Sequence, residues 1–481
     1  MKKLYSALIL IVIAWQLTGC EVKDPTQPQL VTPQQQLVLS KMVAIGNSLT
    51  AGFQSAGLVE EFQLHSYPYL IAKQMGRSAT FEQPLIASPG IGSTPGKTPL
   101  KLVNGNLVAE DLTVDPATLL KNALLPRPYD NLGVPGAALV DVMQAYDAST
   151  AKSGPNPFFD IVLRNPNFGN TSQLQQAILL NPSLIILWIG NNDVLGAALA
   201  GGDLNRITPQ DVFKTQFTTL LSELRQKTRA AIVMANIPYV TDIPFINTLD
   251  GIFRPVPAMG ISEPVPVVFT PKLEPVDFAT SGNEPVYLPL LTQETNVAHL
   301  TLAALVAYAN GIGVPDSARL VAMGFDAALA QGIVQAMKAA GLNPTGLPLP
   351  GSVTLTAEEV AQIRQAVDGF NATLEQLAAQ FKVVLVDMNE MLTRLNQQGI
   401  DGFNGKFVLV DPVNTAFSLD GVHPNHAGYA IVANVFIRAI NQAFQLSIPE
   451  IDTQQFRGQY APAVSARIVH ETIRQAQAIF R

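Results

Sequence analysis

The sequence predicts an α/β protein whose central parallel sheet is covered by helices on both faces. Four short apolar runs have the length and composition of buried strands, at residues 42–45, 184–189, 231–234 and 383–386. Helical patterns separate the later runs, and strands that alternate with helices form parallel sheets. Because such sheets bind ligands at the carboxyl ends of their strands, we expect the functional residues there.

Two segments between these runs show the apolar periodicity of amphipathic helices. The first begins at Thr208, with Pro209 at its first helical position. The second opens with Thr356 and Glu359, spaced as a capping box, and continues with apolar residues three and four apart. A coiled coil would show the same seam, but only about three heptads are present and a strand follows directly. This favours packing on the sheet.

Two further segments interrupt the alternation and are too long for ordinary connections. Residues 76–126 and 240–350 are rich in Pro and Gly, and contain helical pieces such as residues 318–340. We interpret both as large insertions into one domain at residues 38–446. The second insertion is a candidate helical cap over the carboxyl edge of the sheet.

The N-terminus has the proportions of a secretory signal followed by a lipid anchor. Two lysines precede an apolar stretch at residues 4–17, which is too short to span a membrane. The Leu-Thr-Gly-Cys run that ends at Cys20, the only cysteine, resembles a bacterial lipobox. Residues 1–19 are therefore expected to be a signal peptide, Cys20 to carry acyl chains, and residues 20–37 to form a tether. The alternative is a cleaved signal beside an incidental cysteine.

Composition excludes several classes of protein. An apolar content of 48% with 14% charged residues argues against a disordered chain, and a formal charge of -7 argues against nucleic-acid binding. The single cysteine excludes a disulfide scaffold and a multi-thiolate metal site. No uncharged apolar run after Cys20 reaches the roughly 18 residues of a transmembrane helix, so none is expected there.

Four polar elements are expected to meet at the carboxyl edge of the sheet. Ser48 directly follows the first strand, on a turn where its hydroxyl can face solvent. Asp420 and His423 are three residues apart, so one short loop can bring the carboxylate to the imidazole. A serine needs such a base, and the base needs an orienting acceptor, to become a nucleophile. Residues 190–193 follow the second strand, and residues 131–136 can form another turn of the same edge.

These elements resemble the sequence blocks of the SGNH, or GDSL-type, lipase and esterase superfamily. Residues 46–49 resemble its first block, 133–136 its glycine block, 190–193 its Gly-x-Asn-Asp block and 420–423 its last block. The four blocks in the expected order resemble the core of this superfamily, which covers residues 38–240 and 355–446, and the lipobox-like run at Cys20 resembles that of a bacterial lipoprotein member. The resemblance implies a three-layer α/β/α sandwich with flavodoxin-like strand order and a serine hydrolase site.

Carried over residue by residue, the resemblance implies a role for each polar group. Ser48 is the nucleophile, His423 is the general base and then the general acid, and Asp420 holds the imidazole. The oxyanion is bound by the backbone N–H groups of Ser48 and Gly136 and by the side-chain amide of Asn192. No metal or organic cofactor is implied.

Two positions of the match leave room for variation. Gly133 lies three residues before Gly136 and is an alternative oxyanion glycine. The family's first block has Asp where this chain has Asn47, which removes a charge beside the nucleophile and leaves the nucleophile in place. The histidines other than His423 lack the spacing of metal ligands, so we expect no metal site.

The same residues also have purely structural interpretations. Ser48 could cap the helix that follows it, and Asn192 could form a turn and nothing else. Asp420 and His423 could be a hydrogen-bonded pair within a loop. His426, at the expected start of the last helix, fits a surface or capping residue better than a second base.

The function implied is carboxylic ester hydrolysis of the lipase or acylesterase type, on a small-molecule or lipid ester. Phe245, Phe253 and Phe269 make the second insertion apolar enough to cover an acyl chain, and they could equally form its own core. Two alternatives stay open: O-deacetylation of a polysaccharide, and a binding lipoprotein without turnover. The Gly-x-Ser-x-Gly elbow is absent from the sequence, which weighs against an α/β-hydrolase.

The expected location is the bacterial cell envelope, with the lipid on Cys20 as the membrane anchor. Glu21 differs from the Asp that commonly retains lipoproteins at the inner membrane, which favours the outer membrane. Residues 447–481 are expected to form a C-terminal extension with a helix at residues 463–480.

Overall fold

The computed structural model describes residues 37–103, 106–250, 253–255, 264–266, 297–322, 324–339 and 342–460. The predicted signal peptide, Cys20, nearly all of the tether and the predicted helix at residues 463–480 lie outside these ranges. Within them, no helix combines the length and the apolar character needed to cross a membrane.

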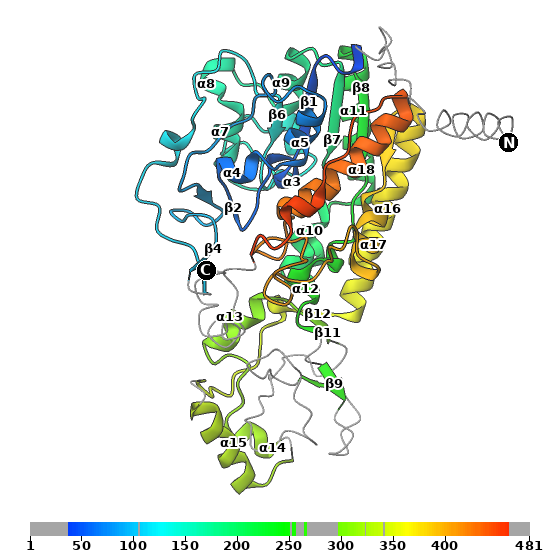
Figure 1. The fold of residues 1–481 in the computed structure, drawn as a ribbon. Coiled ribbons are helices and arrows are strands. Elements are labelled where there is room, and N and C mark those ends of the chain that lie inside the picture. Colours follow the sequence, from blue (N-terminus) through cyan, green and yellow to red (C-terminus); the bar gives the residue numbers. More distant parts are fainter. Residues whose placement is uncertain are drawn as a thin grey trace, which may run out of the picture.

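A five-stranded parallel sheet forms the centre of the fold, in the order β13-β8-β7-β1-β6 (Figure 1). Its strands are β1 (Met42–Gly46), β6 (Asn131–Gly133), β7 (Leu184–Trp188), β8 (Ala231–Ala235) and β13 (Val384–Val386). Counted along the chain, the order is 2-1-3-4-5, which is the flavodoxin-like arrangement. Four strands were predicted to within one residue at each end. β6 was predicted only as a turn, because three residues are too few to show a strand period.

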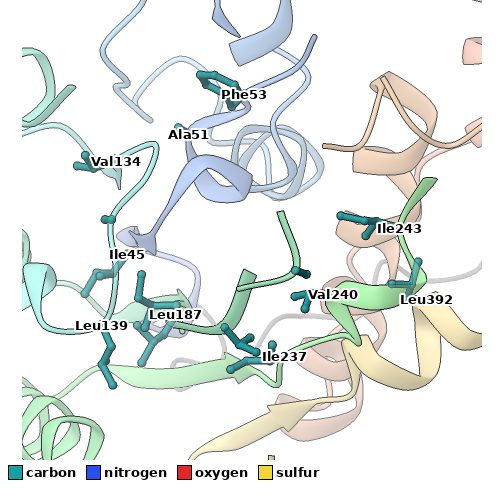
Figure 2. Packing of buried hydrophobic residues seen from close by; sticks show 14 of the residues in the cluster. Ile45, Ala51, Phe53, Val134, Leu139, Leu187, Ile237, Val240, Ile243 and Leu392 are labelled. Atoms are coloured by element: carbon teal, nitrogen blue, oxygen red, sulfur yellow. The ribbon is translucent and has the colours of Figure 1, made fainter. Parts of the chain in front are cut away.

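Helices cover both faces of this sheet, which confirms the predicted three-layer architecture. Alternate side chains of a strand point to opposite faces, so Val43 and Ile45 join one apolar cluster and Met42 and Ala44 the other. The first cluster also holds Leu139 and is shown in part in Figure 2. The covering helices are α9 (Gln173–Leu179), α11 (Gln210–Lys227) and α16 (Ala357–Phe381) on that face, and α5 (Tyr67–Gln74) and α18 (His426–Phe444) on the other.

The two predicted amphipathic helices are α11 and α16, which pack on each other and on the sheet. Rings of Phe213 and Phe370 stack between them with centroids 3.9 Å apart. The capping box of Thr356 and Glu359 is present, as predicted. Pro209 has an extended ψ of 142° and precedes α11 as its cap, so this helix begins one or two residues later than predicted.

Shorter elements connect the strands and helices of the three layers. The helices are α3 (Ser48–Ala51), α4 (Glu60–Gln63), α6 (Asp141–Gln144), α7 (Phe158–Leu163), α8 (Asn165–Phe168), α10 (Asn192–Leu199) and α17 (Met388–Gln397). Short 3₁₀ turns are η1 (Pro116–Leu119), η2 (Leu204–Arg206), η3 (Val240–Asp242), η6 (Gly351–Val353) and η7 (Thr453–Phe456).

The predicted insertions contain only small sheets and helices in their described parts. In the first, β3 (Ile91–Gly92) pairs with β2 (Gly57–Leu58), and β4 (Lys101–Val103) pairs with β5 (Asn106–Val108). The second contains α12 (Pro244–Asn247), β9 (Phe253–Pro255), β10 (Pro264–Pro266), β11 (Val297–Leu300), α13 (Ala303–Ala309), α14 (Ser317–Ala322) and α15 (Ala327–Ala339). β11 pairs with β12 (Thr354–Thr356), which precedes α16.

The helix predicted at residues 318–340 is wrong in one respect, because the chain forms two helices there. Gly324 lies between α14 and α15 with a φ of +97°, a backbone conformation that ends a right-handed helix. Both helices lie apart from the central sheet, at the lower end of the view in Figure 1.

Candidate active site

Ser48 lies where the strand order of the sheet reverses. After β1 the chain adds β6 on one side and then β7 on the other, and such a switch point opens a crevice at the carboxyl ends of the strands. Ser48 is the first residue of α3, directly beyond β1. Asn47, and not Ser48, caps α3, because its Oδ1 accepts a hydrogen bond from the backbone N–H of Leu49 at 3.1 Å.

The Asn47 side chain also makes a hydrogen bond to a second loop of the site. Its Nδ2 donates to Oδ1 of Asn191 at 3.2 Å, a bond that an ionised carboxylate has no proton to make. Asn191 directly follows Gly190 at the end of β7. The amide therefore ties the loop after β1 to the loop after β7.

The structure brings Ser48, His423 and Asp420 into one hydrogen-bonded chain. The Nε2 atom of His423 is 2.9 Å from Ser48 Oγ, and its Nδ1 is 2.9 Å from Asp420 Oδ2. Ser48 is 8% exposed and Asp420 is 6% exposed, so the chain is largely shielded from water. The ring of Phe53 packs against the imidazole, with centroids 4.8 Å apart.

Asp420 is held by backbone donors as well as by His423. Its Oδ2 accepts from the N–H of Ala56 at 2.7 Å, and its Oδ1 accepts from the N–H groups of Val422 and His423 at 2.8 Å each. Burial alone would raise the pKa of Asp420, but the charge interaction with His423 and these hydrogen bonds hold the pKa below its usual value. The carboxylate therefore stays ionised beside the imidazole.

Two parts of the chain distant in sequence fix the loop that carries Asp420 and His423. Ser55 and Ala56 have left-handed φ angles of 51° and 57°, a strained conformation that directs the Ala56 N–H at Asp420. Gly421 has a φ of +68°, and its carbonyl accepts from the N–H of Phe245 in the second insertion at 2.8 Å. The sequence offered no signal for either contact, because both depend on the tertiary fold.

Asn192 is the first residue of α10 and faces the crevice beside Ser48. One N–H of its side-chain amide donates to the carbonyl of Ala137 at 2.8 Å, and an amide nitrogen carries two N–H groups. The bond to Ala137 fixes the amide, so its second N–H has a defined direction. Asn192 is thus an oriented hydrogen-bond donor rather than only a turn residue.

The two candidate glycines of the oxyanion site differ in their surroundings. Gly133 is buried as the last residue of β6, and its N–H already donates to Asn131 Oδ1 at 3.0 Å. Gly136 is exposed, has a φ of +80° and lines the same pocket as Ser48. The carbonyl of the preceding Pro135 accepts from Asn156 Nδ2 at 2.7 Å, which holds this turn in place.

Asp193 positions two loops of the site, a role that the sequence alone did not predict. Its carboxylate accepts from the N–H of Leu139 at 2.9 Å and from the hydroxyl of Thr208 at 2.8 Å. It therefore joins the glycine loop to α10, which carries Asn192. Burial raises the pKa of Asp193 to about 6, although the bonds from Leu139 and Thr208 oppose this. The only feature of the sequence that pointed to Asp193 was its place as the last residue of the Gly-x-Asn-Asp block.

A pocket of about 820 Å³ opens beside Ser48, within the size range of small-molecule sites. Its lining is mostly apolar and includes Phe53, Phe158 and Leu195. Of the three phenylalanines singled out in the second insertion, Phe245 lines this pocket. Phe253 begins β9, and Phe269 lies outside the described residues.

His426 does not lie on the surface, so that part of its predicted role is wrong. It is 6% exposed, and its ring stacks on that of His65 with centroids 3.8 Å apart. Asn425 caps α18, since its side chain accepts from the N–H of Gly428. His299 pairs with Asp250, and His470 lies outside the described residues. In the part of the chain that the structure describes, no group of three or more acidic, His or Cys residues is arranged for a metal.

The stacked pair of histidines should make the fold sensitive to acid. Burial and the neighbouring His65 lower the pKa of His426 to about 3, so the folded protein resists protonation that the unfolded chain accepts below the ordinary histidine pKa of 6.5. The contribution is complete above that value and is lost as the pH falls toward about 3. The loss amounts to about 3 kcal/mol at about pH 4.

We expect His426→Gln to remove most of this loss, measured as urea unfolding free energy at about pH 7 and about pH 4. The variant His299→Gln, which leaves the His65–His426 stack in place, should keep it. An equal acid loss in wild type and His426→Gln would contradict the interpretation.

A serine, an imidazole and a carboxylate aligned on a three-layer α/β/α fold define a serine ester hydrolase. The chain belongs to the family described as GDSL-like Lipase/Acylhydrolase, whose model matches residues 42–258 and 291–436. The match includes all the residues of the hydrogen-bonded chain and both candidate glycines. The predicted superfamily is therefore confirmed.

Comparison with solved structures finds the acetylxylan esterase Axe2 from Geobacillus stearothermophilus. The chain is 12% identical to it over 66% of this chain and 71% of that one, with a TM-score of 0.26. A single-residue mutant of the same enzyme, described as an acetyl-xylooligosaccharide esterase, is 13% identical over 64% and 69%, with a TM-score of 0.25. Among curated proteins, none matches the chain.

Proposed function

We propose that the protein hydrolyses apolar carboxylic esters through an acyl-enzyme formed on Ser48. The observation that carries this proposal is the continuous chain from Ser48 Oγ through the His423 ring to Asp420. A carboxylate that accepts from Nδ1–H leaves Nε2 free of a proton and able to accept the serine hydroxyl proton. Shielding of the chain from water strengthens each of these interactions.

The reaction then follows from the positions of the three groups. Ser48 Oγ attacks the carbonyl carbon while His423 Nε2 takes its proton, and the carbonyl electron pair moves to oxygen. As the tetrahedral intermediate collapses, the bond to the alcohol oxygen breaks and His423 returns the proton to that oxygen. Water attacks the acyl-enzyme with His423 again as base, which releases the acid and restores Ser48. Asp420 stabilises the imidazolium in both halves.

The oxyanion is bound in this proposal by the N–H groups of Ser48 and Gly136 and by the Asn192 amide. All three residues line the same pocket, and Gly133 is the poorer candidate because its N–H is engaged within β6. Donors oriented before the reaction stabilise the developing charge without reorganisation. The fixed amide of Asn192 meets this requirement.

Replacement of Asn192 by alanine is expected to lower kcat by about 10² to 10³, with a smaller change in KM. The donor acts mainly on the charge of the tetrahedral intermediate, which the ground-state ester lacks. The exposed Asn205 of η2 provides a control, since Asn205→Ala should retain the wild-type kcat. A wild-type kcat in Asn192→Ala would remove this residue from the oxyanion site.

The apolar lining of the large pocket supports an apolar ester over a polysaccharide. Side chains such as Phe53, Phe158 and Ile161 offer area for hydrocarbon, whereas a sugar polymer needs many polar partners. Polysaccharide O-deacetylation and binding without turnover are the two alternatives, and the measurements below distinguish each of them from hydrolysis of an apolar ester. The lipid anchor on Cys20 and the outer-membrane location stay predictions of the sequence.

The proposed function is tested with two measurements on the purified protein. A fluorophosphonate probe should label Ser48, as read by peptide mass spectrometry, and p-nitrophenyl acetate should be hydrolysed. Failure of both would leave a binding protein without turnover. Labelling combined with much faster release of acetate from an acetylated polysaccharide than from simple esters would replace the apolar substrate by a sugar polymer.

A further inference from the structure

A second pocket opens onto Ser48 besides the large one. Ser48, Asn192 and His423 line both pockets, but the second encloses only about 80 Å³ against about 820 Å³. Leu195 and Val422 also line both and are only partly buried. The reacting groups therefore stand at the meeting point of a large pocket and a small one.

Away from Ser48 the two pockets are lined largely by different elements. The large pocket is lined by Gly136, which follows β6, and by residues 91–96 of the first insertion. The small pocket is lined by residues that follow β8 and β13, which lie beyond β7 on the other side of β1. Figure 2 shows Val240, Ile243 and Leu392 of the small pocket together, and Phe53 of the large pocket away from them.

The residues that line the two pockets differ in their polarity and exposure. The small pocket is apolar apart from Ser48, His423 and three asparagines, and its Val240, Ile243 and Leu392 are at most 7% exposed. The rim of the large pocket includes the exposed residues Ser93, Pro95 and Gly96. The small pocket is thus a narrow apolar recess, and the large pocket is a wide one whose rim meets solvent.

We propose that the small pocket holds the acyl group and the large pocket holds the alcohol, an assignment that rests on the proposed acyl-enzyme function. The acyl group stays bound to Ser48 while the alcohol departs and a water molecule takes its place beside His423. The alcohol side therefore needs a route to solvent, which the large pocket provides. A narrow apolar recess beside Ser48 can hold a short acyl group through both halves of the reaction.

The volume of the small pocket limits the length of the acyl group. A water-sized group needs about 15 Å³ of such space, so the recess, at about 80 Å³, has room for roughly five such groups and accepts an acyl group of roughly four or five carbon atoms. The large pocket has room for an extended apolar alcohol. The substrate class is a short-chain acyl ester of a bulky apolar alcohol.

Two isomeric esters test the direction of binding. Decyl butyrate and butyl decanoate have the same atoms and differ only in which side of the ester carries the long chain. We expect kcat/KM for decyl butyrate to exceed that for butyl decanoate by about tenfold or more, since misplaced methylene groups in a fitted apolar pocket carry penalties of this size. Equal values, or a preference for butyl decanoate, would overturn the assignment.

Variants of α17 test the residues that set the chain-length limit. Met391→Trp should fill the recess and lower the ratio of p-nitrophenyl butyrate to p-nitrophenyl acetate hydrolysis by about tenfold. Leu392→Ala should widen the recess and raise the ratio of hexanoate to butyrate hydrolysis, in assays held below its unfolding midpoint. Gln397→Trp, at an exposed position of the same helix, is the control and should leave both ratios unchanged.

The outcomes separate this assignment from the proposed function. A protein that labels with fluorophosphonate and hydrolyses p-nitrophenyl acetate, but shows no isomer preference, overturns only the pocket assignment. A protein that fails both of those assays overturns the proposed function itself. Unchanged chain-length ratios in Met391→Trp and Leu392→Ala also overturn the assignment, because they would place the acyl group elsewhere.

Discussion

Replacement of Ser48 by alanine is expected to lower kcat by about 10⁶ and to abolish fluorophosphonate labelling. Alanine removes the only atom that forms the bond to the acyl group, and His423 then has no serine proton to accept. The measurement is the initial rate of p-nitrophenyl acetate hydrolysis, at a protein concentration high enough to detect a rate lowered by about 10⁶. Any residual rate should come from the oxyanion donors and from substrate binding alone.

Stability provides the control for this variant. Ser48 is nearly buried but contributes one neutral hydrogen bond, so the unfolding free energy should change by only about 1 kcal/mol. The exposed Ser447, beyond α18, can be replaced by alanine as a matched variant with wild-type activity. A folded Ser48→Ala protein that keeps a substantial fraction of the rate would contradict the acyl-enzyme mechanism.

The parts of the fold that sequence could predict are those with a strong local signal. Long amphipathic helices such as α16 repeat their apolar residues many times, and buried strands such as β7 form continuous apolar runs. β6 gives no such signal, because Asn131–Gly133 forms a strand only through its pairing with β1. Gly324 likewise interrupts a helical pattern that composition alone would continue.

The residues of the active site likewise divide into those that the sequence could predict and those that it could not. Ser48, Asp420 and His423 could be named from short motifs, because the chemistry needs those residue types in those positions. The groups that orient them could not, since Ala56 and Phe245 act through backbone N–H groups, which every residue except proline carries. In the sequence, Asn47 is only a departure from the family pattern. Its bond to Asn191 depends on the fold, which places the two loops side by side.

The small pocket illustrates why specificity is harder to predict than chemistry. Its walls come from Leu49, from Pro238, Val240 and Ile243, and from Met391 and Leu392, which lie far apart in the sequence. Each is an ordinary apolar residue that a sequence pattern assigns to the core. Only the order of strands β13, β8 and β7 brings them beside Ser48.

Replacement of Asp420 by asparagine should lower kcat by about 10⁴ while the protein stays folded. An asparagine that offers its amide N–H to Nδ1 of His423 places the imidazole proton on Nε2. That nitrogen then has no lone pair for the Ser48 hydroxyl, 2.9 Å away. The imidazolium formed during attack also loses the carboxylate charge that stabilises it. The loss should appear in kcat more than in KM, because both effects act after the ester is bound.

The alternative interpretation is that Asp420 merely shapes its loop, through the bonds it accepts from Ala56, Val422 and His423. Such a role predicts a lower unfolding free energy with a nearly unchanged rate in the fraction that remains folded. The relay role predicts slow fluorophosphonate labelling of Ser48 in fully folded Asp420→Asn protein, because the probe reacts with the same activated oxygen. Asp211→Asn, which removes an exposed carboxylate on α11, controls for the loss of one charge. Wild-type labelling rates in both variants would show that His423 activates Ser48 without its acidic partner.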